Sequence, residues 1–133
     1  MRLRAEQLTD NLKRKGLSPI YYISGDEPLQ MLEAADLVRR MARQQGCEER
    51  SVLDVVKGFD WNQLSQASAN LSLFASRRLI ELRLGSQKPG KEGASALVEY
   101  AAQTDSEDVL LITSDKIDKR IQQGRWFKAV DSA

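Results

Sequence analysis

Four stretches of the chain have the pattern of buried β-strands. Each is a compact run rich in leucine, β-branched and aromatic residues, bounded by glycine, proline or charged residues. The predicted strands cover residues 20–23, 51–56, 78–84 and 109–112. The last of them, Val-Leu-Leu-Ile, has the strongest strand character.

Between these runs, apolar residues recur every three to four positions, which predicts amphipathic helices. The predicted helices cover residues 28–45, 61–69 and 94–103, with a short helix near 8–15 and a helical stretch at 117–130. Pro28 and Asp60 fit helix starts, because proline loses no hydrogen bond in a first turn and an aspartate oxygen can accept one from a terminal amide. A loop is expected over residues 85–93.

Strand and helix alternate four times, and this alternation is typical of an α/β protein. We therefore expect a parallel, doubly wound sheet with helices on both faces. Such sheets bind ligands beyond the carboxyl ends of their strands, so the strand-to-helix loops are the first place to look for chemistry.

Composition excludes several kinds of chemistry. The 133 residues carry 20 Lys+Arg and 19 Asp+Glu, a net charge of +1, which provides no strong field to attract nucleic acid or anionic lipid. The absence of histidine excludes Ser-His-Asp triads, Cys-His dyads and His-bearing metal sites, and the single cysteine excludes an internal disulfide. No apolar stretch is long enough to span a membrane, and the basic residues 1–4 precede no apolar run, so we expect a cytoplasmic protein.

The loop after the first predicted strand, Gly25–Pro28, occupies the position of a phosphate-binding loop but lacks its parts. A phosphate loop, G-x-x-x-x-G-K-[ST], supplies backbone N–H groups, a lysine and a hydroxyl. Here Asp26 and Glu27 would repel phosphate, and Pro28 has no N–H. These residues indicate a capped helix start that holds no nucleotide or other cofactor.

A second stretch, Gly85–Glu92, also fits G-x-x-x-x-G-K between a strand and a helix. However, Glu92 stands where the magnesium-binding hydroxyl belongs, and Pro89 removes one N–H from the cradle. A polar loop is therefore favoured, and a small P-loop-like NTPase that uses Gly85–Lys91 is an alternative function.

Asp54 could form the phospho-acceptor pocket of a receiver-like signalling domain, together with Asp26, Glu27 and Lys116. The acceptor of such a pocket should end its strand, whereas Val55 and Val56 still follow Asp54 in the predicted strand. An exposed strand position is favoured, and the receiver-like domain is the second alternative.

Neither the basic pairs nor the cysteine indicates a separate site. The basic pairs at 39–40, 77–78 and 119–120 are scattered among acids, which is typical of a solvated surface. Glu48 and Glu49 are expected to raise the pKa of Cys47, which disfavours a reactive thiolate.

The segment Leu71-Ser72-Leu73-Phe74-Ala75-Ser76 lies between a predicted helix and a predicted strand and has no periodicity. A Leu-Phe pair beside a strand is usually part of a core. Two large apolar side chains in an exposed linker could instead insert into a pocket of a partner protein. The residues alone leave both interpretations open.

Several stretches together resemble the N-terminal domain of the delta subunit of the bacterial DNA polymerase III clamp loader, over nearly the whole chain. The most specific of them is Leu-Ser-Leu-Phe-Ala-Ser-Arg at residues 71–77. The supporting stretches are Tyr21–Leu29, Asp60-Trp61, Asp108–Ile112 and Trp126-Phe127.

The resemblance implies an AAA+ type α/β domain, similar to a P-loop NTPase but without a functional P-loop. It would be a non-catalytic subunit of the DNA-directed DNA polymerase III holoenzyme, acting in DNA replication. The resemblance further implies that the chain binds the beta sliding clamp and opens the ring. Leu73 and Phe74 would enter a hydrophobic pocket on the clamp, supported by Leu71, Ser72 and Ala75.

Other partners are also implied by the resemblance: the gamma/tau and delta prime subunits, and primed DNA only within the assembled loader. In this family the domain continues into a helical lid domain and a C-terminal collar domain, neither of which follows here. We therefore expect residues 1–133 to be the N-terminal AAA+ like domain, cut before a fifth strand. That strand would lie beside the first, so residues 20–23 are expected at a sheet edge.

Overall fold

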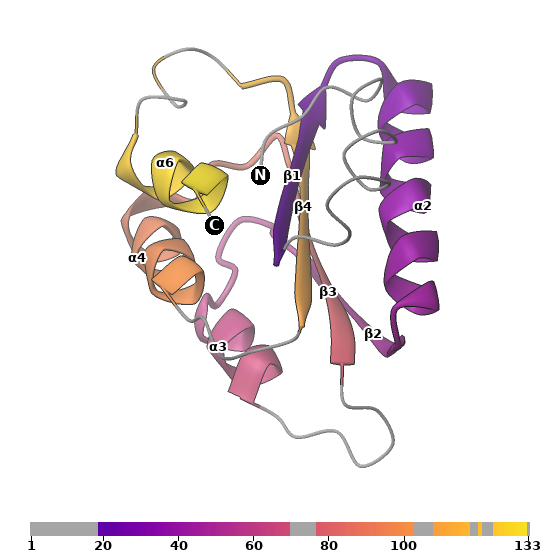
Figure 1. Ribbon diagram of the computed structural model, residues 1–133. Helices are drawn as coiled ribbons and strands as arrows, with labels where there is room; N and C mark the ends of the chain where they lie inside the picture. Colours follow the sequence, from indigo (N-terminus) through magenta and orange to yellow (C-terminus); the bar gives the residue numbers. More distant parts are fainter. Residues whose placement is uncertain (1–18, 70–76, 103–107, 118–119, 121–123, 133) are drawn as a thin grey trace.

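The structure, a computed structural model, describes residues 19–69, 77–102, 108–117, 120 and 124–132. Within them, four parallel strands form one sheet in the order β1-β4-β3-β2 (Figure 1). The strands are β1 (Ile20–Gly25), β2 (Cys47–Asp54), β3 (Arg77–Gly85) and β4 (Val109–Asp115). The helices are α2 (Pro28–Gln44), α3 (Asn62–Ala69), α4 (Gly90–Ala102) and α6 (Arg125–Ser132).

Helices cover both faces of the sheet. Helix α2 lies on one face, and α3, α4 and α6 lie on the other (Figure 1). The connection from each strand to the next passes through a helix, as parallel strands require. The predicted doubly wound α/β fold is confirmed.

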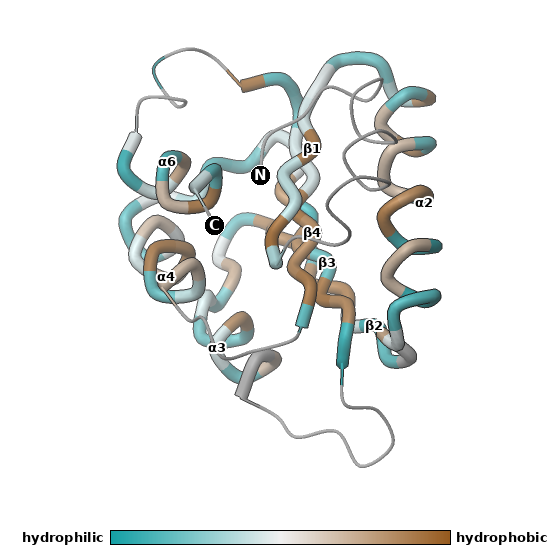
Figure 2. Tube along the Cα trace, viewed as in Figure 1, coloured by the Kyte–Doolittle hydropathy of each residue, from teal (hydrophilic) through white to brown (hydrophobic). Residues whose placement is uncertain are grey.

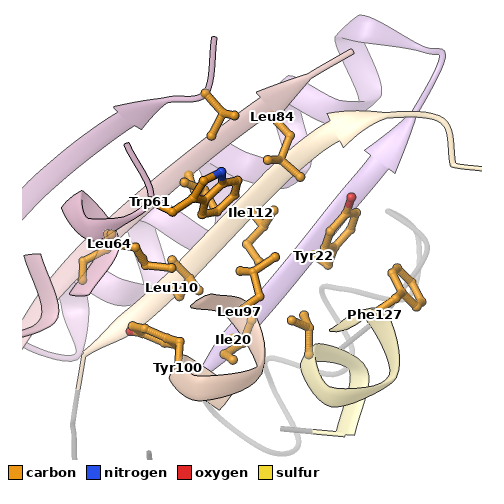
Figure 3. Close-up of a cluster of buried hydrophobic side chains, with 14 residues drawn as sticks. Ile20, Tyr22, Trp61, Leu64, Leu84, Leu97, Tyr100, Leu110, Ile112 and Phe127 are labelled. Carbon is orange, nitrogen blue, oxygen red and sulfur yellow. The ribbon is translucent and has the colours of Figure 1, made fainter. Parts of the chain in front are cut away.

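The sheet separates two hydrophobic clusters, because successive strand residues point to opposite faces. On one face, Ile80 and Leu82 of β3 pack with residues of α3, α4 and α6, and this cluster includes the aromatic side chains of Tyr22, Trp61, Tyr100 and Phe127 (Figure 3). On the other face, Leu79 of β3 packs with Ala35 and Val38 of α2. Figure 2 shows the resulting distribution, with hydrophobic residues along β3 and β4 and hydrophilic residues on the outer side of α2.

Strand β1 lies at one edge of the described sheet, as expected. It pairs with β4 in a register that places Ile20 beside Leu110 and Gly25 beside Asp115. The predicted short helix near residues 8–15 lies outside the described residues.

The boundaries of several elements differ from the prediction. Strand β4 covers Val109–Asp115 rather than 109–112, and within the stretch expected to be helical at 117–130 the structure describes α6 at Arg125–Ser132. Strand β2 covers Cys47–Asp54 rather than 51–56, because main-chain pairing with β3 accommodates polar residues such as Arg50 at the sheet edge. Gly46, with φ of 100°, permits the turn from α2 directly into this strand. Helix α4 begins at Gly90 rather than at residue 94, so the loop expected over 85–93 is shorter.

Candidate functional site

The predicted clamp-binding residues Leu71, Ser72, Leu73, Phe74 and Ala75 lie outside the described residues. The structure describes what precedes and follows them: α3 ends at Ala69, and β3 begins at Arg77. Their role therefore stays a prediction. Of the candidate site, the structure describes the two flanking elements, α3 and β3.

Helix α3 is fixed to the core before the segment begins. Asp60 Oδ1 accepts a hydrogen bond from the main-chain N–H of Asn62 at 3.0 Å, which confirms Asp60 as the cap of this helix. Trp61 and Leu64 are buried, and the Trp61 ring meets the Phe59 ring edge-to-face at 5.2 Å. Gly93 of α4 lies directly against Trp61, where a Cβ would approach two ring carbons to 2.6 Å.

Strand β3 is fixed just after the segment ends. Asp108 accepts two hydrogen bonds from Arg78, one from its main-chain N–H at 3.0 Å and one from Nη2 at 2.8 Å. Arg77 Nη1 donates to the main-chain oxygen of Gln45 at 3.0 Å, beyond the end of α2. Arg78 is therefore part of a structural ion pair, and the interpretation of residues 77–78 as a merely solvated pair is wrong for it.

Two further titratable groups lie near this end of the sheet. Burial raises the pKa of the Tyr100 hydroxyl, with a further rise from Asp108 and an opposing effect of Arg78. Among the described residues, that hydroxyl is the one buried side-chain polar atom without a hydrogen-bond partner. Burial likewise raises the pKa of Cys47, with a further rise from Asp108 and an opposing effect of Arg77, so the direction expected for the thiol is confirmed.

The opposite, carboxyl end of the sheet carries a cleft of about 820 Å³ between α2 and the ends of the strands. Residues of mixed character line it, among them Asp26, Met31, Arg39, Arg83, Asp115 and Lys116. Asp26 lies in this cleft where a phosphate loop would hold anions, and Pro28 opens α2 without an N–H. Pro28 starts α2 as predicted. Glu27 stands at the N-cap position but its side chain makes no capping hydrogen bond.

The stretch Gly85–Glu92 connects β3 to α4. Strand β3 ends at Gly85 and α4 begins at Gly90, with Lys91 and Glu92 exposed in its first turn. The Pro89 ring is buried against Gly93, where a Cβ would lie 2.7 Å from Pro89 Cβ. This packing holds the proline in place and leaves no N–H at that position for a phosphate.

The residues of the receiver-like alternative are not brought together. Asp54 ends β2, so the prediction that the strand continues through Val56 is wrong. However, β3 and β4 lie between β2 and β1, which separates Asp54 from the β1 end by about 14 Å, three inter-strand spacings. Asp26 and Lys116 share the cleft, and Asp54 does not line it.

A buried carboxylate that the sequence pattern did not single out lies behind this cleft. Glu81 of β3 is 1% exposed and accepts hydrogen bonds from Arg39 at 2.7 and 3.0 Å and from Arg50 at 2.6 Å. Burial alone would raise the pKa of Glu81, but the hydrogen bonds and charges of Arg39 and Arg50 outweigh it, so the pKa is lowered. Arg39 therefore holds α2 to the sheet and does not belong to a solvated pair. The signal available in the sequence is an acidic residue in the middle of a buried strand.

Among the residues that the structure describes, no group of three or more cysteine, aspartate or glutamate side chains is placed to hold a metal ion. In the same part of the chain, no helix is long and apolar enough to cross a membrane.

Comparison with known families settles which family has this arrangement. The family model described as "DNA polymerase III, delta subunit" matches residues 21–133. The chain belongs to this family. The resemblance of residues 21–29, 60–61, 71–77 and 108–112 to the delta subunit is thereby confirmed at the level of the family.

Individual members of the delta subunit family agree with this assignment. The chain is 31% identical over 130 residues to "DNA polymerase III subunit delta" of Escherichia coli, covering 98% of this chain and 38% of the relative. It is 31% identical over 131 residues to the protein of the same name from Haemophilus influenzae, covering 95% of this chain and 36% of the relative. The chain thus spans less than two fifths of the length of these relatives.

A solved structure of a delta protein shares the fold. The structure of the Bacillus subtilis DNA clamp loader delta protein matches with a TM-score of 0.68 at 20% identity, over 96% of this chain and 40% of that one. At this identity the match supports the α/β architecture, and the residues that act must be tested on this chain itself.

Proposed function

We propose that residues 1–133 form the N-terminal, AAA+ like domain of a clamp-loader delta subunit that acts in DNA replication. The observation that carries the proposal is the match of the delta subunit family to residues 21–133. In this proposal the domain binds the beta sliding clamp through residues 71–75 and opens the ring. Leu73 and Phe74 enter an apolar pocket on the clamp, and Leu71, Ser72 and Ala75 support them.

The arrangement of the flanking elements supports a role for this segment. The segment starts at a helix fixed by Trp61 and Leu64 and ends at a strand fixed by Arg78 and Asp108. An insertion between two fixed ends loses less conformational freedom on binding than a free tail would. A short apolar insertion on a rigid domain is a suitable geometry for filling a pocket on a partner.

The Leu-Phe pair needs support from further contacts. Burial of one leucine and one phenylalanine contributes roughly 3–6 kcal/mol, before the cost of association is subtracted. Trp61 and Arg78 are occupied within the domain, so they are poor candidates for this support. The exposed α3 positions Gln63 and Gln66 are better placed to contact the clamp.

The proposed role is non-catalytic, with ATP hydrolysis supplied by other loader subunits. Asp26 at the carboxyl edge and Pro28 at the start of α2 support it, because neither favours a bound polyphosphate. The gamma/tau and delta prime subunits are the proposed partners in the full-length protein. Primed DNA is proposed as a partner only within the assembled, cytoplasmic loader.

The test is the affinity of the chain for the cognate beta sliding clamp, measured by surface plasmon resonance. The double variant Leu73→Ala/Phe74→Ala is expected to abolish measurable binding while the far-UV circular dichroism and the melting midpoint stay close to those of the parent. The matched control is Leu29→Ala/Leu32→Ala, which truncates two exposed apolar side chains on α2. The control should bind the clamp like the parent.

Two outcomes would contradict the proposal. Undiminished affinity in Leu73→Ala/Phe74→Ala would show that clamp binding does not depend on this pair. Global unfolding of that variant, with the control folded, would assign the pair to the core of the domain instead.

A further inference from the structure

Strand β2 forms one edge of the described sheet. It pairs with β3 on one side, and among the residues that the structure describes no strand lies on its other side. Three exposed residues alternate along its second half: Arg50, Val52 and Asp54. Because alternate strand residues point to the same face, their side chains share one face of the sheet. That face is the one covered by α2, since Arg50 and Arg39 of α2 both donate to Glu81.

The main-chain groups of these three residues point away from β3. The N–H of Val55 donates to the main-chain oxygen of Arg83 at 2.9 Å, so the amide of residue 55 faces β3. The N–H and C=O groups of successive strand residues alternate between the two sides of the strand. Those of Arg50, Val52 and Asp54 therefore face outward. Such a row of outward N–H and C=O groups is a template on which a further strand can pair.

The side chains at this edge restrict which strand can be added. Val52 is 40% exposed, and the side chain of Arg50 is 47% exposed. Charged residues at a sheet edge oppose pairing with most other strands, because like charges directly opposite each other are destabilising. A matching strand must place an acid opposite Arg50, an apolar residue opposite Val52 and a base opposite Asp54.

A second copy of β2 meets all three requirements. When two copies pair antiparallel with Val52 opposite the same residue of the second copy, Arg50 of each copy lies opposite Asp54 of the other. The central pair is then apolar, and both flanking pairs have opposite charges. Residues whose main-chain groups face each other in such a pair exchange both hydrogen bonds, so the outward groups of all three residues find partners. A register shifted by two residues would instead place Val52 opposite a charged residue.

We propose that β2 is a self-association edge, through which two copies of this chain pair antiparallel at Arg50, Val52 and Asp54 and join their sheets. This interaction goes beyond the proposed function and does not rest on it. The net charge of +1 causes little repulsion between two copies. Because the contact is small, the dimer is expected to be weak, with a dissociation constant on the order of 100 µM.

The first experiment measures the oligomeric state by sedimentation velocity, from about 10 µM to about 1 mM chain, a range that brackets the expected dissociation constant. The weight-average mass of the parent should rise from monomer towards dimer. Val52→Lys places two ammonium groups opposite each other at the centre of the contact and should weaken the dimer at least about tenfold. The matched control is Leu29→Lys, the same gain of charge at an exposed apolar position of α2, which should change the dissociation constant less than about twofold.

A second experiment tests the register by disulfide formation, in a Cys47→Ala background that removes the one native thiol. Val52→Cys places two thiols opposite each other, with the Cα atoms about 5.5 Å apart, a separation that a disulfide can span. Asp54→Cys is the control, because its two copies lie at least about 14 Å apart along the edge. In a glutathione redox buffer, Val52→Cys should form covalent dimers at least about tenfold faster than Asp54→Cys, because only its thiols lie within bonding distance.

Three results would overturn the proposal: a parent that stays monomeric at about 1 mM, a dimer that Val52→Lys weakens no more than Leu29→Lys does, or equal cross-linking rates in the two cysteine variants. If Val52→Lys does not fold, Asp54→Lys takes its place, since it sets a like charge opposite Arg50. Its matched control is Glu33→Lys on the exposed side of α2. These measurements involve no clamp, so their failure would leave the proposed function standing.

Discussion

Arg39 of α2 donates two parallel hydrogen bonds to Glu81 of β3, from Nε to Oε1 at 2.7 Å and from Nη2 to Oε2 at 3.0 Å. The two residues are 42 positions apart in the chain, and their pairing ties the helix on one face to a central strand. Arg50 of β2 joins the same carboxylate at 2.6 Å. A single buried acid thus connects three elements.

Replacement of Glu81 by glutamine should destabilise the domain substantially. Glu81→Gln removes the buried anion to which Arg39 and Arg50 both donate, while Arg39 keeps Asp36 and the Arg50 side chain is partly exposed to water. We therefore expect a loss of about 2 kcal/mol in the free energy of unfolding. Urea unfolding at pH 7 measures it. The control is Glu99→Gln on the exposed side of α4, which should change stability by less than about 0.5 kcal/mol.

The same carboxylate should make the stability depend on pH in acid. Since the folded-state pKa of Glu81 is lowered, its contribution is present above the unfolded-state value, near 4.5, and is lost as the pH falls through the folded-state pKa. Urea unfolding between pH 7 and pH 3 should therefore show the gap between the parent and Glu81→Gln narrowing below about pH 4.5. A gap that stays constant down to pH 3 would contradict an ionised Glu81 in the folded protein.

Gly93→Ala should destabilise the domain although alanine favours helices. The added Cβ would lie 2.6 Å from the Trp61 ring and 2.7 Å from Pro89, both of which are buried, so the neighbours have little room to move. Overpacking of this kind costs about 1–3 kcal/mol, which exceeds the gain of up to about 1 kcal/mol in helix propensity. Thermal unfolding followed by tryptophan fluorescence tests it, with Ser95→Ala on the exposed side of α4 as a control that should be neutral. A more stable Gly93→Ala would show that α4 can shift away from Trp61.

Two tyrosine-to-phenylalanine substitutions should act in opposite directions. Tyr100→Phe removes a buried hydroxyl that lacks a hydrogen-bond partner, and we expect a gain of about 1 kcal/mol in stability. Tyr22→Phe removes a hydroxyl that donates to Ser114 Oγ at 2.8 Å, and we expect a loss of about 1 kcal/mol. Denaturant unfolding of both variants provides the comparison. Equal effects of the two substitutions would indicate that the Tyr100 hydroxyl has a partner in solution.

These contacts also show which features local patterns can predict. The spacing of apolar residues predicted all four strands and the helices on both faces, and the hydrogen-bonding capacity of Asp60 predicted the helix cap, because these features depend on neighbours in the sequence. The start of β2 could not be predicted this way, since its polar residues Glu49 and Arg50 are held by main-chain pairing with β3. The start of α4 was missed because Gly90 and Gly93 have low helix propensity, while Gly93 is required by contact with Trp61.

For the candidate site, too, local sequence patterns indicate some residues and cannot indicate the long-range ion pairs. The residues 71–75 stand out by their composition between a helix and a strand, which is local information. The partners of Arg78 and Arg39, Asp108 and Glu81, are 30 and 42 positions away, so a list of charged pairs cannot separate them from solvated residues. Only the order of the strands brings each acid to its arginine.

The chain should not bind ATP at either of its two phosphate-loop-like segments. Asp26 lines the carboxyl-edge cleft, and a carboxylate there opposes a polyphosphate. At the other segment, the buried Pro89 ring fixes a position that lacks an N–H, and Glu92 replaces the magnesium-binding hydroxyl beside Lys91. Isothermal titration with Mg·ATP should therefore show no saturable binding tighter than about 1 mM. Saturable binding that Lys91→Ala abolishes and that Lys88→Ala, an exposed lysine of the same stretch, leaves intact would favour the NTPase alternative over a non-catalytic role.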